Sequence, residues 1–182
     1  DHELFPKPLA TKFRKDDERV LATGTTMPQM VEMFLNRHGS PDWFMTHKMP
    51  VRDSTGQTIG IMGTVERYNQ EKALKSADPE IAKAVEKLLS HPENFSSVTE
   101  LAEEAGMSRR HFNRRFKDET SLTPIQFLGR SRIQLACQLL RSKREKTISD
   151  IALEIGFCDQ SAFTTQFRER MGTTPFKYRQ AY

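Results

Sequence analysis

Apolar positions follow a strand-like spacing in the N-terminal part of the chain and a helical spacing in the rest. Val31, Met33 and Leu35 alternate along one β-compatible run, and two further extended runs follow it after short turn sequences. Strands joined by turns this short are expected to pair antiparallel. The predicted strands are Met30–Asn36, Trp43–Val51 and Ile59–Val65, and a short helix is predicted ahead of them at Asp16–Thr23.

A helix is predicted to begin at Pro79. Asp78 is a favourable N-cap residue, and proline suits the first helical position. The helix is expected to end at the His91-Pro92 pair, because a proline cannot continue it. Its apolar face consists of Ile81, Ala84, Val85, Leu88 and Leu89.

The remaining sequence contains one segment twice, at residues 98–127 and 148–178. Leu101, Ala102 and Gly106 correspond to Ile151, Ala152 and Gly156 at a spacing of 50, and Phe112, Phe116, Thr123 and Pro124 correspond to Phe163, Phe167, Thr174 and Pro175 at a spacing of 51. The one-residue difference falls after each glycine, where a turn can absorb it. Two copies of a helix–turn–helix unit predict two contacts with DNA.

Each copy carries the signals of a helix, a turn and a second helix. A capping-box sequence precedes the first helix at Ser97–Glu100, and residues 147–150 resemble one. Gly106 and Gly156 follow the apolar stripe of that helix, where the chain must turn with a positive φ. The expected N-caps of the second helices are Ser108 and Asp159. Between the copies, a Thr-Pro pair starts a long linking helix that we predict at residues 124–142.

Composition is that of an ordinary globular protein, with 36% hydrophobic and 29% charged residues among 182. No run of about 18 apolar residues is present, and no signal peptide is visible, so we expect no membrane partner. Cys137 and Cys158 do not make a disulfide framework, and a reducing cytoplasm fits them best. The chain begins with Asp1 and not with methionine, so we expect a fragment or a trimmed chain.

The net charge of +4 is small, but residues 108–117 hold five basic side chains and no acid. Those basic residues are Arg109, Arg110, Arg114, Arg115 and Lys117. A surface of one sign favours phosphate, whereas an ordinary solvated helix face mixes both signs. Nucleic acid is therefore the favoured partner, and a plain solvated face is the alternative.

The polar face of each second helix carries side chains that can contact DNA. A helix in the major groove brings its N-terminal side chains to the base edges, where arginine pairs with guanine and asparagine or glutamine with adenine. The predicted DNA-binding residues are Arg109, Arg110, Asn113, Arg114 and Lys117 in the first unit, and Gln160, Ser161, Thr164, Thr165 and Arg168 in the second. We expect more electrostatic attraction from the first set, and more hydrogen bonding and methyl contact from the second.

Two sequences carry a family resemblance. The first is L-A-E-E-A-G-M-S-R-R-H-F-N-R-R-F-K at residues 101–117, and the second is the long, fixed pattern I-A-x-x-x-G-F-x-D-Q-S-x-F…F…G-x-T-P-x-x-Y-R from residue 151. Residues 77–182 therefore resemble the DNA-binding domain of the AraC/XylS family of bacterial transcription regulators. The resemblance implies seven helices in two subdomains, with two helices in successive major grooves. It assigns base contacts to Arg110, Asn113, Arg114, Gln160, Ser161, Thr164 and Thr165.

One residue departs from that family pattern. Ser121 stands where the family has a glycine before the first Thr-Pro pair, so we expect a differently shaped helix end there.

The strand-like part carries a second resemblance. The pattern W-x-x-T-x-K-x-P-x-R-D-x-x-G-x-x-x-G-x-x-G at residues 43–63 is similar to the last two strands of a PAS sensor domain. A full PAS domain has further strands and helices ahead of Asp1, so a pocket would lack a wall and we name no ligand-binding residues.

The predicted fold class is α+β, with a small antiparallel PAS-like sheet segment followed by an all-α, seven-helix double helix–turn–helix domain. The predicted domains are a partial PAS-like sensor or dimerisation domain at 1–70, a linker at 71–77 and an AraC-type DNA-binding domain at 78–182, with helix–turn–helix units at 97–118 and 147–171.

The leading prediction is a sequence-specific transcription regulator, an activator by family habit, with double-stranded DNA and RNA polymerase as partners. The alternative is an N-terminal module that is only a protein-interaction surface and has no small-molecule ligand. A homodimer and a small-molecule effector remain open. No catalytic grouping or phosphate-binding glycine loop supports an enzyme, and the five histidines lack metal-ligand spacing, so no cofactor or metal is predicted.

Several side chains have a structural and a functional interpretation. Trp43 is expected to pack between strands rather than to stack on a ligand, and Cys137 to be a small core residue. For four basic residues, phosphate contact competes with a role at helix ends or in solubility. These are Arg168, Arg170, Lys177 and Arg179.

Overall fold

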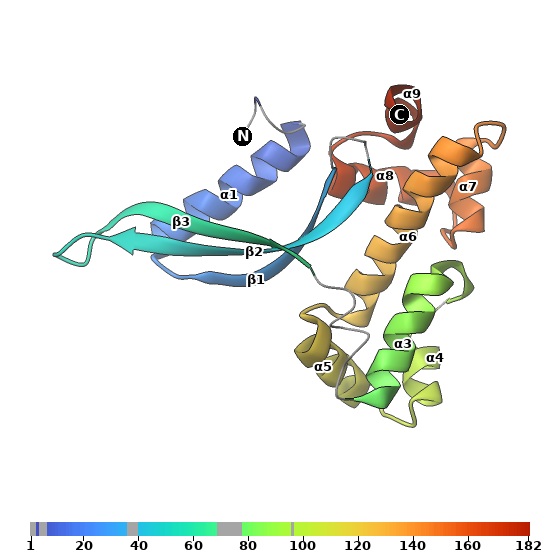
Figure 1. Ribbon diagram of the computed structural model, residues 1–182, viewed down its shortest axis with the longest axis horizontal. Helices are drawn as coiled ribbons and strands as arrows, with labels where there is room; N and C mark the ends of the chain where they lie inside the picture. Colours follow the sequence, from blue (N-terminus) through green and yellow to red (C-terminus); the bar gives the residue numbers. More distant parts are fainter. Residues whose placement is uncertain (1–2, 4–6, 36–39, 69–77, 96) are drawn as a thin grey trace.

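The computed structural model describes residues 3, 7–35, 40–68, 78–95 and 97–182, and combines a three-stranded sheet with a group of helices (Figure 1). The elements are α1 (Lys7–Thr23), β1 (Met27–Leu35), β2 (Pro41–Arg52), β3 (Thr58–Arg67), α3 (Pro79–Ser90), the 3-10 helix η1 (Pro92–Asn94), α4 (Val98–Glu104), α5 (Arg109–Thr120), α6 (Pro124–Ser142), α7 (Ile148–Glu154), α8 (Gln160–Met171) and α9 (Pro175–Ala181). The predicted α+β class is confirmed, with seven α-helices in the described residues from Pro79 onward. The predicted linker at 71–77 lies outside the described residues.

The sheet is antiparallel, in the order β1-β2-β3, as predicted. Val31 and Met33 of β1 are buried, but Glu32 between them is buried as well, so burial in this stretch does not follow the alternation seen in the sequence. The strand begins at Met27, three residues ahead of the predicted start, and its pairing with β2 shifts between Met27 and Met30. Gly56 turns the chain from β2 to β3 with a φ of 86°.

The N-terminal helix is longer than predicted. Residues 16–23 are helical and the helix ends at Thr23, as predicted, but α1 already begins at Lys7. Its buried residues Leu9, Phe13 and Val20 fall on one helical face, and that face packs against the sheet (Figure 1). Packing of this apolar face stabilises the helix at residues 7–15 as well, where the sequence pattern alone did not predict one.

Helix α6 is the central support of the helical part, with α3–α5 at one end and α7–α9 at the other (Figure 1). Phe127, Ile133 and Leu140 of α6 have no exposed surface. Thr123 forms a complete capping box with Gln126 at the start of α6. The N-terminal capping box therefore fixes where α6 begins. Its buried side chains hold it against the helices at both ends.

Ser121 does not reshape the end of α5, so that expectation was wrong. The residue adopts a left-handed conformation with φ 61° and ψ 7°, and its amide donates to the carbonyl of Lys117. Gly172 at the end of α8 has φ 69° and ψ 3° and makes the equivalent bond to Arg168. The serine thus takes the glycine conformation, which costs a residue with a Cβ about 1 kcal/mol.

The sheet and the helices share one hydrophobic core. Trp43 of β2 is 4% exposed and meets Phe127 of α6 edge-on, with ring centroids 5.2 Å apart. Its ring also lies 5.7 Å from that of Tyr68, whose hydroxyl donates to the carbonyl of Thr120 at 2.7 Å. Trp43 is therefore a packing residue, as predicted, but it packs against α6 rather than between strands, and so joins the base of the sheet to the helical part.

Candidate nucleic-acid interface

Helix α5 is held to the core by its phenylalanine face. Ser108 caps the helix by accepting the amide of His111 at 3.3 Å. Phe112 and Phe116 are completely buried, and the Phe116 ring meets Phe127 edge-on at 5.5 Å between centroids. This anchoring leaves the opposite face of α5 in solvent, so we call α5 the first recognition helix.

An ion pair fixes the orientation of this helix. Arg115 Nε lies 2.7 Å from Asp78 Oδ2, and the Asp78 side chain is only 5% exposed. The other oxygen of Asp78 caps α3 by accepting the amides of Glu80 and Ile81. Arg115 therefore belongs to the support of α5, although the basic run in the sequence does not distinguish it from its neighbours.

All five DNA-binding residues predicted in the first unit lie on the solvent-facing side of α5. Four are exposed and Asn113 is half-buried. The exposed four are Arg109, Arg110, Arg114 and Lys117. The structure thus brings these four cations together on one face of one helix.

Helix α8 is built in the same way and is the second recognition helix. Asp159 accepts the amide of Ala162 at 2.7 Å, and this hydrogen bond, followed by one from the Cys158 thiol, lowers the pKa of the carboxyl group. Phe163 and Phe167 are completely buried. The predicted contact residues of the second unit are exposed, apart from the half-buried Thr164, and they are Gln160, Ser161, Thr165 and Arg168.

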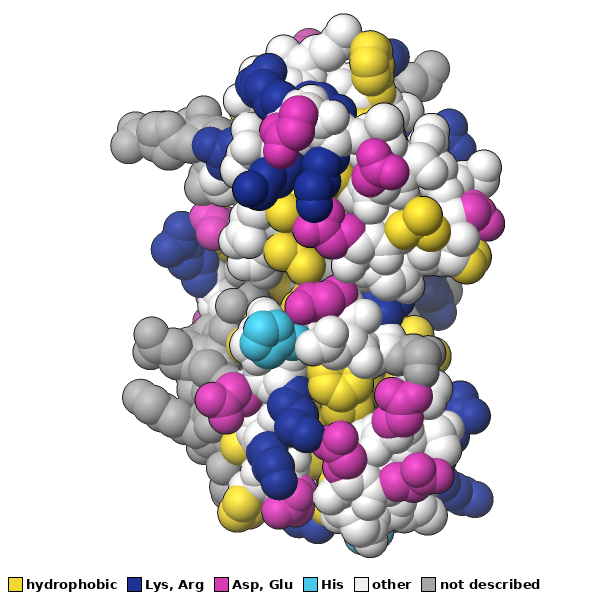
Figure 2. Space-filling view, turned by 90° about the vertical axis from the view of Figure 1, so that its right-hand side faces the viewer, with side chains coloured by type: hydrophobic (Ala, Val, Ile, Leu, Met, Phe, Trp, Pro, Cys, Tyr) yellow, Lys and Arg dark blue, Asp and Glu magenta, His cyan; other side chains and the backbone are white. Residues whose placement is uncertain are grey.

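The two recognition faces differ in charge, as the sequence indicated. The face of α5 has four cationic side chains, whereas that of α8 has Arg168 alone among its predicted contacts. Elsewhere, basic and acidic side chains are interspersed over the face that Figure 2 shows. A concentration of one sign on α5 would contribute most of the electrostatic attraction to phosphate.

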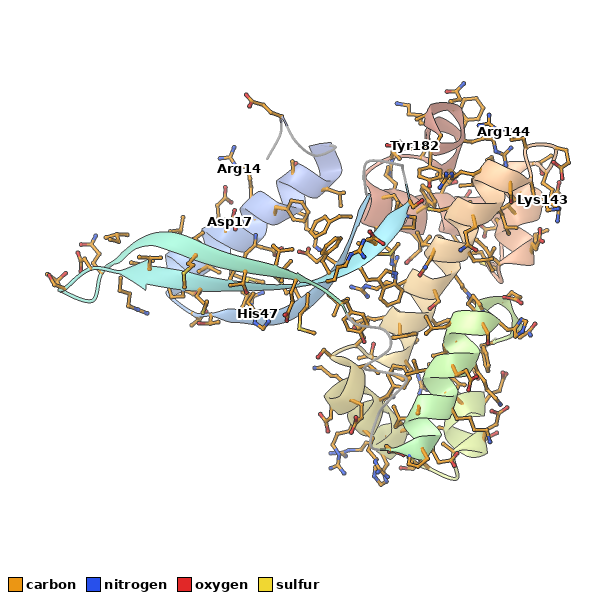
Figure 3. The ribbon with its side chains drawn as sticks, viewed as in Figure 1. Arg14, Asp17, His47, Lys143, Arg144 and Tyr182 are labelled. Carbon is orange, nitrogen blue, oxygen red and sulfur yellow. The ribbon has the colours of Figure 1, made fainter. Side chains whose placement is uncertain are left out.

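Two of the basic residues with competing interpretations serve the protein interior. Arg179 Nη1 donates to the carbonyl of Lys146 at 2.8 Å, which ties α9 to the loop after α6. Arg170 is partly buried and donates to Gln166 of its own helix. Lys177 is exposed, and so are Lys143 and Arg144, which follow the end of α6 (Figure 3).

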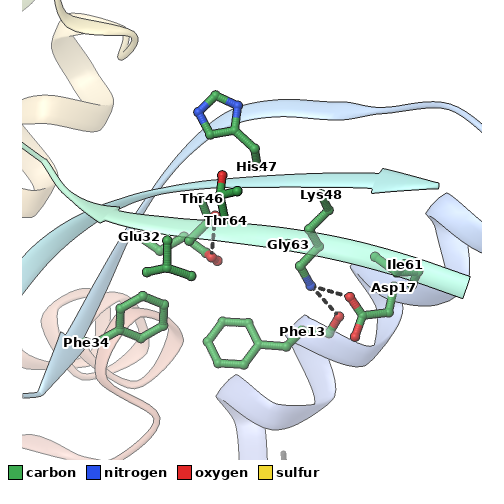
Figure 4. Close-up of a pocket in the computed structure, with 11 residues that line it drawn as sticks. Phe13, Asp17, Glu32, Phe34, Thr46, His47, Lys48, Ile61, Gly63 and Thr64 are labelled. Carbon is green, nitrogen blue, oxygen red and sulfur yellow. Dashed lines mark hydrogen bonds and ion pairs between the residues drawn. The ribbon is translucent and has the colours of Figure 1, made fainter. Parts of the chain in front are cut away.

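A cavity of about 330 Å³ lies between α1 and the sheet (Figure 4). Two of its charged groups pair with each other: Lys48 Nζ lies 2.5 Å from Asp17 Oδ1, and it also donates to the carbonyl of Phe13 at 3.0 Å. Glu32 accepts the hydroxyl of Thr46 at 3.0 Å. No residue of this cavity was predicted from the sequence, because its walls come from a helix and strands that are adjacent only in the folded chain.

Other kinds of site receive no support from the described residues. They contain no group of three or more histidine, cysteine, aspartate or glutamate side chains placed to hold a metal ion. In the same part of the chain, no helix combines the length and the apolar character needed to cross a membrane.

Two helix–turn–helix units, joined by one helix and each presenting a polar recognition helix, define a DNA-binding protein. A family model described as a helix–turn–helix domain matches residues 101–181, and one described as a PAS fold matches residues 1–73. The chain belongs to the AraC family of transcription regulators.

Individual relatives agree with this assignment. The DNA-binding domain of AdpA, a global transcriptional factor solved in complex with a target DNA, is 36% identical, with a TM-score of 0.53 over 58% of this chain and 94% of that one. An AraC-type regulator from Chromobacterium violaceum is 29% identical, with a TM-score of 0.51 over 56% of this chain and 90% of that one. The activator RclR of Escherichia coli is 30% identical over 68% of this chain and 44% of its own length. The chain thus spans less than half the length of that relative.

Proposed function

We propose that the chain is a sequence-specific transcription activator that places α5 and α8 in successive major grooves of DNA. Residues 78–182 form the DNA-binding domain in this proposal, and residues 1–70 form a module for sensing or dimerisation. The observation that carries it is the matched construction of the two helices, each with a buried phenylalanine pair and an exposed polar face. The protein acts in the cytoplasm with RNA polymerase as a partner, and it has no catalytic role.

The two helices have unequal tasks. The first recognition helix contacts phosphate and bases through Arg109, Arg110, Asn113, Arg114 and Lys117. The second contacts bases through Gln160, Ser161, Thr164 and Thr165, with Arg168 at phosphate. Because α5 has the greater charge, substitutions there should reduce the salt dependence of binding more than substitutions on α8.

Selection of binding sites from random duplex DNA with the full chain tests this proposal. We expect a bipartite site whose two parts lie about one helical turn apart, roughly 10 base pairs between centres. Recovery of no enriched sequence would overturn sequence-specific binding. Recovery of a single short element would overturn the use of both helices.

Variants on the selected site then test the individual roles. Arg114→Ala should cost about 1–3 kcal/mol at one base position, if the side chain makes a bidentate contact there. Lys117→Ala should weaken all sequences equally and lower the logarithmic salt slope by about 0.9. Arg14→Ala is the matched control, because Arg14 is an exposed cation that projects from α1 on the side away from the sheet (Figure 3).

An N-terminal module that only binds another protein is the second candidate. The cavity between α1 and the sheet favours sensing over this candidate, since a pure interaction surface needs no cavity. A thermal-shift screen of metabolites with the full chain separates them, because a ligand that binds the folded state raises the melting temperature. Stabilisation by no compound would favour the interaction surface.

A further inference from the structure

A second cavity, of about 370 Å³, lies where the sheet meets the second helix–turn–helix unit. It is distinct from the cavity of Figure 4, because its walls also include α6 and α8. Its apolar wall comes from α1 and β1 and consists of Leu9, Phe13, Val31 and Met33. A volume at the lower end of the range for ligand pockets suits a small metabolite.

Two guanidinium groups face this cavity from the helical side. Arg130 of α6 donates from Nη2 to the carbonyl of Val31 and from Nη1 to that of Gln126 at 3.2 Å. Arg170 of α8 donates to the carbonyl and the side chain of Gln166 of its own helix, and to no other group in the described part of the chain. Neither arginine takes part in any of the ion pairs found among the described residues.

The carboxylates around the cavity neutralise this pair only in part. Glu32 Oε1 lies 2.5 Å from Lys12 Nζ, and the same carboxylate also attracts Arg130. Glu169 is exposed and attracts Arg170 from the rim. Three cations and two carboxylates line the cavity in total, and this leaves an excess of one positive charge at the arginines.

The charged form of Arg130 is destabilised by its surroundings, and a bound anion would stabilise it. Burial, together with the nearby charge of Arg170, lowers the pKa of this guanidinium to about 10, although Glu32 and Tyr68 act in the opposite direction. Two like charges in a partly desolvated site repel each other, whereas a carboxylate between them would pair with both. The planar fork of arginine matches the two oxygens of a carboxylate.

We propose that this cavity binds a small organic acid, with its carboxylate on Arg130 and Arg170 and its apolar body against α1 and β1. The inference deepens the proposed function, since it rests on the sensing role of the N-terminal module. Arg170 belongs to the second recognition helix, whereas the apolar wall belongs to the module. An acid bound between them links the two, and its occupancy therefore changes the affinity for DNA.

Isothermal titration calorimetry on the full chain tests the site with hexanoate as the probe. Hexanoate has both a carboxylate and an apolar body, acetate lacks the body, and 1-hexanol lacks the charge. We expect hexanoate to bind about tenfold more tightly than either, a difference of about 1.4 kcal/mol. Equal affinity for acetate and hexanoate, or for hexanol and hexanoate, would overturn the proposal.

Two variants examine the arginine fork directly. Arg170→Gln removes the charge. Gly129→Ala keeps the charge of Arg170 but adds a Cβ atom 2.9 Å from Arg170 Nη2, which is too close for the guanidinium to stay in place. Alanine is favourable within α6, so the second variant displaces the guanidinium without weakening the helix. Both should lower hexanoate affinity about tenfold. Arg14→Gln, which removes the same charge from an exposed site, should leave it unchanged.

Fluorescence anisotropy with the selected duplex, without acid, separates this inference from the proposed function. If the chain binds the duplex but does not bind hexanoate, the acid site is refuted and the proposed DNA-binding function stands. Hexanoate binding that depends on Arg170 supports the acid site, even in a chain that fails to select DNA. Hexanoate affinity that is the same for Arg170→Gln as for the parent refutes the site.

Discussion

Replacing Arg115 with methionine should destabilise the fold and leave base recognition unchanged. The substitution keeps most of the aliphatic stem but removes the charge that pairs with Asp78 at 2.7 Å. Removal of one partner costs about 3–5 kcal/mol for a buried pair, against about 0–1 kcal/mol for an exposed pair. Asp78 is 5% exposed and Arg115 is 42% exposed, so this pair lies between those limits. Because Asp78 also keeps its two amide hydrogen bonds, we expect a loss of about 2 kcal/mol.

Urea unfolding of the full chain, followed by circular dichroism, measures this loss. Arg114→Met is the matched control, because it removes the same charge from the next residue of the same helix, where the side chain is exposed. It should change stability by less than about 0.5 kcal/mol and lower DNA affinity instead. A double-mutant cycle with Asp78→Asn isolates the coupling of the pair.

The opposite pattern would refute this reasoning. An Arg115→Met protein as stable as the parent would mean that the ion pair does not support α5. A loss of DNA affinity in Arg115→Met equal to that in Arg114→Met, at unchanged stability, would place Arg115 in the DNA interface.

Three further results are expected. Ser121→Gly should raise the free energy of unfolding by about 1 kcal/mol, because it relieves a left-handed conformation; an unchanged urea midpoint would contradict this. Trp43→Ala should cost about 3–5 kcal/mol and destabilise the helices as well as the sheet, since the ring packs on Phe127; loss of sheet signal alone would show that the two parts unfold independently. Burial raises the pKa of Cys137 and of Tyr68 to about 12, from 9.0 and 10.0. The unfolded chain therefore releases both protons at lower pH than the folded chain, so the free energy of unfolding should fall as the pH rises from about 9 towards 12. A urea midpoint that rises over this interval would contradict the burial of the two groups.

Short-range signals accounted for most of the helical part. Asp78, Ser108, Thr147 and Asp159 each cap the helix that follows, because a cap acts within three residues of its own position. Gly106 and Gly156 adopt positive φ for an equally local reason. The exposure of the predicted contact residues also followed from spacing, once the phenylalanine pairs marked the buried side of each helix.

The start of α1 and the orientation of α5 could not be obtained in this way. Helix α1 begins at Lys7 because its apolar face is covered by the sheet, and the strands that cover it come later in the chain. Arg115 differs from Arg114 only because Asp78 lies beside one of them in the folded state. No spacing within the basic run carries that information.

Two helix–turn–helix units, their caps and their polar faces are properties of the sequence alone, since each depends on residues a few positions apart. The tertiary structure decided how the sheet meets the helices, through Trp43 on Phe127 and Tyr68 on Thr120. It also placed two arginines of different helices beside the edge of β1 and so created a cavity. Such contacts join residues up to about a hundred positions apart, and they exist only after packing has fixed the distances and desolvated the charges.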